Sequence, residues 1–112
     1  MRTIQEIVQD NDLFRTTLLV SLRHRIVLTN TVACLRERDP KVFSEIIHMV
    51  STFKDFNEDN DPYGEHDFGS FEVGGISYFW KIDYYAAGWE AGVDPKEEIP
   101  HLLLTIMAAD DY

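Results

Sequence analysis

Residues 68–85, FGSFEVGGISYFWKIDYY, decide the fold, because they read as a β-hairpin with a two-residue turn. Gly74 and Gly75 separate two runs rich in aromatic and β-branched residues, and glycine accepts the positive φ that such turns require. A turn here pairs Val73 with Ile76 and thereby fixes the register of the whole hairpin. The remaining predicted pairs are Glu72 with Ser77, Phe71 with Tyr78, and Ser70 with Phe79.

This register sorts the side chains onto two faces, because alternate residues of a strand point to opposite sides of a sheet. We expect one face to join the core, namely Phe71, Val73, Ile76, Tyr78, Trp80 and Ile82. The other face would carry Ser70, Glu72, Ser77, Phe79, Lys81 and Asp83. Phe79 is an aromatic residue among polar ones there. It is either an exposed anchor for a binding partner or a residue covered by the loop AAGWEAGVDP, residues 86–95.

Two helices are predicted ahead of the hairpin. The first starts at Thr3, which can form a capping box with Glu6. The second starts after Asp39, a good N-cap, with Pro40 at the first helical position. Its apolar residues form a wide face, made of Val42, Phe43, Ile46, Ile47, Met49, Val50 and Phe53. His48 lies off this face, so we expect it in solvent.

Two further strands complete the predicted fold. Residues 25–35, RIVLTNTVACL, are dense in β-branched residues and contain no breaker. Residues 101–112, HLLLTIMAADDY, are apolar enough to be a buried strand. The chain is therefore expected to be α+β, in the order α-β-α-β-β-β, with two helices on one face of a mostly antiparallel sheet of about four strands. Its length favours a single domain over residues 1–112.

Cysteine usage and hydropathy point to the cytoplasm. Cys34 is the single cysteine, so no internal disulfide can form, and its apolar neighbours favour a buried, inert thiol. The N-terminus carries charges throughout and lacks the apolar core of a signal peptide. No apolar run approaches the ~20 residues that a membrane span needs.

Charge is distributed unevenly along the chain, whose net charge is −10. Residues 55–112 hold fourteen Asp and Glu but only two basic residues, Lys81 and Lys96. So acidic a protein should repel nucleic acid, and we expect no direct binding to it. The acidic half would instead attract a cation, which is either a metal ion or a basic protein surface.

The segment just before the hairpin is the most acidic and offers a possible metal site. Its ligand candidates are Asp59, Asp61, Glu65, His66 and Asp67, which supply hard oxygen atoms and one imidazole. A helix-loop-helix calcium loop is a poor match, because its bidentate carboxylate position is occupied by Ser70. The structural alternative is a tight loop around Pro62 and Gly64, in which Asp and Asn side chains bond to the backbone.

Three segments together resemble a known family. They are DNDLFR at residues 10–15, FNEDNDPYGEHDFGSFEVGGISYFWKIDYY at residues 56–85, and LLLTIMAADDY at residues 102–112. The chain resembles the proteobacterial domain-of-unknown-function family numbered 3768. This resemblance implies no particular chemistry, but it implies an association with plasmids and other mobile elements near anti-restriction genes, and hence an accessory or anti-defence role.

The leading functional hypothesis is a small acidic cytoplasmic interaction protein without catalytic activity or cofactor. It would inhibit a nucleic-acid-binding defence protein, in the anti-restriction or anti-CRISPR manner, by mimicking DNA on a basic surface. The expected binding residues are Glu58, Asp59, Asp61, Glu65, Asp67, Glu72, Phe79, Lys81 and Asp83. One alternative is a metal-dependent hydrolase or nuclease that uses the Asp59–Asp67 segment. Another is a homodimer that pairs through the C-terminal strand.

Overall fold

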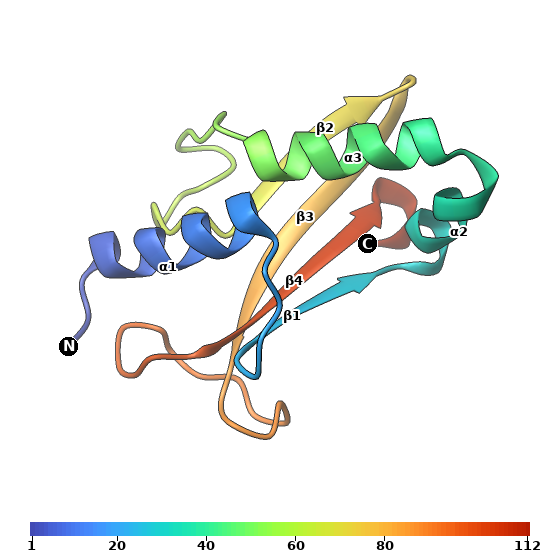
Figure 1. Ribbon diagram of the computed structural model, residues 1–112. Coiled ribbons are helices and arrows are strands. Elements are labelled where there is room, and N and C mark those ends of the chain that lie inside the picture. Colours follow the sequence, from blue (N-terminus) through green and yellow to red (C-terminus); the bar gives the residue numbers. More distant parts are fainter.

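The computed structural model describes residues 1–112 and shows three helices on one face of a four-stranded sheet (Figure 1). The α+β class is confirmed, with one helix more than expected. The elements run in the order α1 (Ile4–Thr17), β1 (His24–Leu28), α2 (Asn30–Arg38), α3 (Pro40–Thr52), β2 (Phe68–Val73), β3 (Ile76–Tyr85) and β4 (His101–Ala108), followed by a short 3-10 helix (Ala109–Asp111). None of the helices is long and apolar enough to cross a membrane.

The sheet is mixed, with strand order β1-β4-β3-β2. Strands β2, β3 and β4 pair antiparallel, as the expected mostly antiparallel sheet requires, whereas the parallel pairing of β1 with β4 was not predicted. The C-terminal strand β4 lies between β1 and β3, and both of its edges are paired. It therefore has no free edge for a second copy, and the homodimer expected through this strand cannot form that way.

The hairpin has the predicted register. Gly74 and Gly75 form the turn with φ of 60° and 79°, and Val73 pairs with Ile76. The pairs of Phe71 with Tyr78 and of Ser70 with Phe79 are also as expected. Every residue of the expected core face is buried except Ile76, which is 56% exposed. Ile76 adjoins the turn, where the hairpin extends past the helices.

Helix α2 is the main departure from the prediction. The strand expected over residues 25–35 ends at Leu28, and a helix begins at Asn30. Val32 is fully buried and Leu35 packs against the core, a spacing that puts one face of a helix on the sheet. Packing has thus overridden the β propensity of this segment. Cys34 lies on the outer side and is exposed, so the expected buried thiol is wrong.

The other helix signals are confirmed. Thr3 and Glu6 form the capping box of α1, and Leu18 caps its C-terminus in a left-handed conformation with φ of 55°. The Asp39 side chain accepts a hydrogen bond from the Val42 N–H at 3.3 Å and caps α3. His48 is exposed, as expected.

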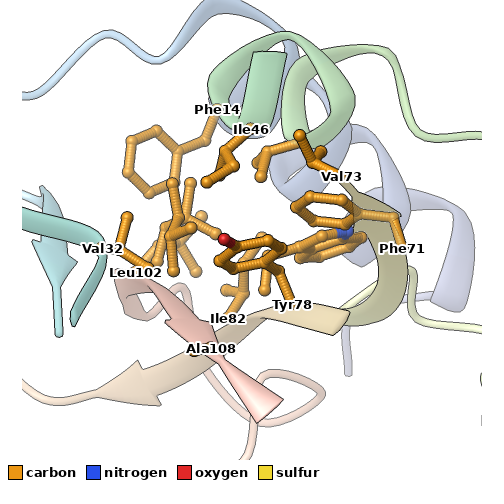
Figure 2. Close-up of a cluster of buried hydrophobic side chains, with 13 residues drawn as sticks. Phe14, Val32, Ile46, Phe71, Val73, Tyr78, Ile82, Leu102 and Ala108 are labelled. Atoms are coloured by element: carbon orange, nitrogen blue, oxygen red, sulfur yellow. The ribbon is translucent and has the colours of Figure 1, made fainter. Parts of the chain in front are cut away.

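The core lies between the helices and the sheet, as Figure 2 shows for side chains such as Ile46 of α3 and Tyr78 of β3. Trp80 is fully buried at its edge, with Phe53 and Phe56 against it at ring distances of 5.6 and 6.1 Å. Gly69 on β2 allows this packing, because a Cβ there would lie 2.4 Å from the indole nitrogen of Trp80. Burial of the Trp80 side chain contributes about 2–3 kcal/mol to stability.

No helix covers the other face of the sheet. Phe79 lies there, half-buried between Phe68 at 5.4 Å and the C-terminal Tyr112 at 5.6 Å. The loop of residues 86–95 does not cover it, because Trp89 of that loop packs on Tyr85 at the far end of β3. Phe79 therefore belongs to a small aromatic cluster closed by the C-terminus.

Candidate functional site

The acidic segment forms a loop between α3 and β2, and we call residues 55–67 the acidic loop. Asparagine side chains shape its tip. The Asn57 side chain accepts hydrogen bonds from the N–H groups of Asp59 and Asn60, at 2.9 and 3.1 Å, and the Asn60 amide donates to the Asp55 carbonyl at 2.7 Å. Because amides hold the turn, the side chains of Glu58 and Asp59 make no bond in the fold and stay exposed.

Asp61 has a structural position instead. Its side chain is buried and accepts hydrogen bonds from the N–H groups of Glu65 and His66, at 3.1 and 3.2 Å. These bonds hold His66 in the left-handed region, with φ of 56°. This conformation is uncommon for a residue with a side chain, and it persists where the surroundings enforce it.

His66 is fixed between the loop and α1. Its ring stacks on Phe56 at 3.8 Å with an interplanar angle of 5°, and its Nδ1 lies 3.1 Å from a carboxylate oxygen of Asp12. The other ring nitrogen, Nε2, is 3.9 Å from the nearest oxygen of Asp61, too far for a hydrogen bond. His66 therefore keeps one ring nitrogen without a partner in the fold.

Arg15 of α1 is almost completely buried. Its Nη1 donates to the carbonyl of Val50 at 2.8 Å, and its Nη2 donates to Asp12 at 3.2 Å. The guanidinium also lies 4.8 Å from the ring centroid of Trp80, within cation–π range. Burial lowers the pKa of Arg15, and the Asp12 carboxylate opposes this effect.

A second polar group ties the loop to β3. The buried Asn11 side chain donates to the Tyr84 hydroxyl at 2.9 Å and to the Glu65 carbonyl at 3.0 Å. The Tyr84 hydroxyl lies 3.3 Å from a carboxylate oxygen of Glu65 and 3.3 Å from one of Asp67. Burial raises the pKa of Glu65, which the negative charge of Asp67 raises further, and burial also raises the pKa of Asp67 and Tyr84. The single Tyr84 hydroxyl proton thus lies between the carboxylates of Glu65 and Asp67. Ionising both carboxylates at once is unfavourable, because they are partly buried and close to each other.

The structure divides the expected binding residues into three groups. Glu58 and Asp59 are exposed at the loop tip, whereas three residues point inward, namely Asp61, Glu65 and Asp67. The residues on the open face of the sheet are Glu72, Phe79, Lys81 and Asp83, with Lys81 paired to Asp83 at 3.1 Å. The loop and Phe79 do not share one surface as expected, because Asp67 turns to Tyr84 on the helix-covered side.

The proposed metal ligands do not converge. Nowhere in the chain do three or more His, Cys, Asp or Glu side chains come together in a way that could hold a metal ion. Asp61 bonds to backbone N–H groups, Glu65 and Asp67 bond to Tyr84, and His66 bonds to Asp12. Asp59 lies apart from them at the exposed tip.

Several residues of this region were not predicted. Tyr63 is 77% exposed in the acidic loop. Its position directly after Pro62 was the only feature of the sequence that could have indicated this exposure. Asn11, Asp12 and Arg15 reach the loop and β3 over separations of up to 73 positions, which no local pattern reveals. The one available hint was Asn11, a polar residue that lies four positions after Ile7 and three before Phe14 and so shares their face of the helix.

Unpaired negative charge is spread over the C-terminal half of the chain. Ten exposed carboxylates of residues 55–112 have no cationic group within 4.0 Å, namely Asp55, Glu58, Asp59, Glu72, Glu90, Asp94, Glu97, Glu98, Asp110 and Asp111. The backbone N–H of Arg2 bonds to the Lys96 carbonyl at 2.7 Å, and Asn11 bonds to Glu65, so α1 lies between the acidic loop and residues 94–98 (Figure 1). Both flanking segments carry free carboxylates.

Comparison with known proteins gives one match. The model of a family described as a protein of unknown function, DUF3768, matches residues 28–111. No curated protein and no solved structure matches the chain. The matched residues contain the acidic loop and the hairpin. Helix α1 lies outside them, although it contributes Asn11, Asp12 and Arg15 to the polar contacts of the loop.

Proposed function

We propose that this chain, which belongs to the DUF3768 family of proteins of unknown function, is an interaction protein whose acidic loop binds a basic surface of another protein. The observation that carries this proposal is the set of free carboxylates at a loop tip that other groups hold in place. Carboxylates needed for folding would be bonded, as Asp61 is. Glu58 and Asp59 are exposed and unbonded, so their charge is available to a partner.

The shape of the loop supports binding at low entropic cost. Asn57 and Asn60 fix the tip, Asp61 holds the backbone at His66, and the His66 ring fastens the loop to Asp12 of α1. A loop ordered before binding loses less conformational freedom when the complex forms. Long-range attraction by the carboxylates would also speed association with a cationic partner.

Tyr63 is the proposed anchor within this charged surface. It is 77% exposed and follows Pro62, so its large ring projects from the loop without a contact that explains it. Tyrosine is enriched among the few residues that dominate binding energy at interfaces, where its ring is buried and its hydroxyl finds a partner. Replacing Tyr63 by alanine should therefore weaken the complex by ~2 kcal/mol or more.

The finer proposal is that the partner is a nucleic-acid-binding defence protein of the cytoplasm and that this chain occupies its DNA site. A surface rich in unpaired carboxylates supports this proposal, because DNA presents closely spaced negative charges to such proteins. The resemblance to a family associated with mobile elements also favours a role against host defence. No catalysis and no cofactor are needed for inhibition of this kind.

Charge reversal at the loop tip tests the proposal. The double variant Glu58→Lys, Asp59→Lys should lose a partner that the unchanged protein captures from host extract, and thermal stability should stay nearly unchanged because exposed charges contribute little to folding. Glu65 is left unchanged, since it bonds to Tyr84. The matched control is Glu37→Lys, Glu45→Lys, which makes the same change of net charge at exposed helix positions.

Capture should also weaken between about 0.05 and 0.5 M salt, because screening shortens electrostatic attraction to a few ångströms. A partner lost equally from the loop variant and the helix control would show that net charge, not the loop, governs capture. A partner retained by the loop variant at every salt concentration would refute the proposal.

A further inference from the structure

A cavity of about 270 Å³ lies on the inner side of the acidic loop, between the second half of α1 and the end of α3. Its walls come from elements far apart in the sequence. They are Asp12, Arg15, Thr16, Ser51, Thr52, Phe53, Lys54, Phe56 and His66. The cavity therefore exists only in the folded chain, and its volume is near the lower end of the range for small-molecule sites.

The charge of its lining is unusual for this protein. Arg15 and Lys54 face a single carboxylate, Asp12, so the lining has a net charge of about +1 before any proton on His66 is counted. Four further hollows of the surface each have more Asp and Glu than Lys and Arg in their linings. Among these five hollows, an anion would meet the least repulsion in the cavity at Arg15 and Lys54.

The helix ends at the cavity oppose anion binding. Helices α1 and α3 both finish here, and the free carbonyl groups at a helix C-terminus repel an anion. Arg15 donates to the carbonyl of Val50, one of the last four carbonyls of α3. An anion in the cavity therefore relies on the positive charges of Arg15 and Lys54 to outweigh the two helix ends.

Three nitrogen groups at the cavity have unused hydrogen-bonding capacity. The Nε–H of Arg15 is buried and has no acceptor, although the side chain is only 2% exposed. The Nε2 of His66 has no partner, because Asp12 occupies Nδ1 and Asp61 is 3.9 Å away. Lys54 forms no ion pair. A buried donor left unsatisfied is costly, and a ligand that accepts its hydrogen bond removes that cost.

We propose that this cavity is a binding site for a small molecule that presents an oxyanion, either a carboxylate or a phosphate, to Lys54, His66 and Arg15. Lys54 supplies the mobile charge at the entrance. His66 donates its Nδ1–H to Asp12, so its Nε2 becomes a second donor, facing the ligand, when the ring is protonated. A small shift of Arg15 opens its Nε–H to the ligand. The exposed part of Phe53 would contact the apolar part of the molecule. This site is independent of the acidic loop's binding to a protein partner.

The test is a titration of the isotope-labelled full chain followed by NMR, with inorganic phosphate and, separately, with acetate as probes. Sodium chloride at the same ionic strength is the reference. Saturable shifts of the Arg15 Nε–H and His66 ring signals are expected with at least one probe and not with chloride. Shifts with phosphate only or with acetate only would identify the kind of oxyanion.

The variant Lys54→Gln should weaken the binding of that probe by about tenfold, as expected when one charged donor is lost. Lys41→Gln, at the other end of α3, removes the same charge from an exposed position and should leave binding unchanged. The proposal is overturned if neither probe gives saturable shifts. It is also overturned if Lys54→Gln binds as well as the Lys41→Gln control.

Discussion

Replacement of Gly69 by alanine tests the close packing of the start of β2 against the Trp80 and Phe53 rings. The added Cβ would lie 2.4 Å from the indole nitrogen of Trp80 and 2.8 Å from the tip of the Phe53 ring. The Trp80 ring cannot retreat easily, because it is fully buried and Arg15 lies over it at 4.8 Å. Overpacking of this kind costs about 1–3 kcal/mol. For a domain of this size, each kcal/mol lowers the melting temperature by roughly 4–8 °C.

The matched control is Gly92→Ala. There the nearest atom to the added Cβ is the Tyr84 carbonyl oxygen at 3.7 Å, an ordinary contact. This variant should keep its stability or gain about 0.4–1 kcal/mol, because alanine restricts the unfolded chain. Urea unfolding followed by circular dichroism measures both free energies of unfolding. Equal stability of the two variants would refute the contact between Gly69 and Trp80.

Three other changes have definite expected outcomes. The folded protein raises the pKa of Glu65 above its unfolded value, so the proton is bound more tightly in the fold and stability falls as pH rises through the folded pKa. Glu65→Gln should therefore flatten the decline in stability above about pH 4.3, measured by thermal melts across pH, and an unchanged profile would contradict this. Cys34 is exposed, so an aromatic disulfide reagent should label it as completely in the native protein as in urea, and protection would contradict its placement. Phe79→Ala should lower the free energy of unfolding in urea by about 2 kcal/mol, less than the ~3–5 kcal/mol expected for a fully buried ring, because Phe79 is half-buried beside Tyr112. A loss below about 0.5 kcal/mol would show that the aromatic cluster does not stabilise the fold.

Signals that act over a few residues predicted the fold well. Gly74 and Gly75 set the hairpin register through the φ values that their turn needs, and Asp39 with Pro40 set the start of α3. In each case the residue types and the backbone geometry they favour lie within a few positions of one another. Where local signals agree in this way, the local structure can be predicted before any long-range contact is known.

Long-range packing explains what the sequence did not reveal. The segment containing Val32 has β-branched residues but folds as a helix, because its apolar residues meet the sheet at helical spacing. The placement of β4 in the middle of the sheet, parallel to β1, depends on pairings between distant segments. Neither outcome follows from propensity, which packing routinely overrides.

The sequence predicted where in the chain the candidate site lies, but it did not predict which of its carboxylates are buried and which are exposed. Asp61 and Asp59 are two positions apart, yet one is buried as a backbone acceptor and the other is exposed. The difference arises because α1 packs against only one side of the loop, through Asp12 and Asn11. Composition gave the negative charge of the region, and the fold determined which carboxylates remain free.

The most direct test of the proposed function is a displacement measurement on the captured partner. Fluorescence anisotropy would follow a labelled DNA duplex bound to that partner while this chain is added. The account predicts that the unchanged protein releases the duplex, that Glu58→Lys, Asp59→Lys does not, and that the helix control Glu37→Lys, Glu45→Lys still does. A partner that binds this chain and its DNA together, with no loss of anisotropy, would contradict the claim that the acidic loop occupies a DNA site.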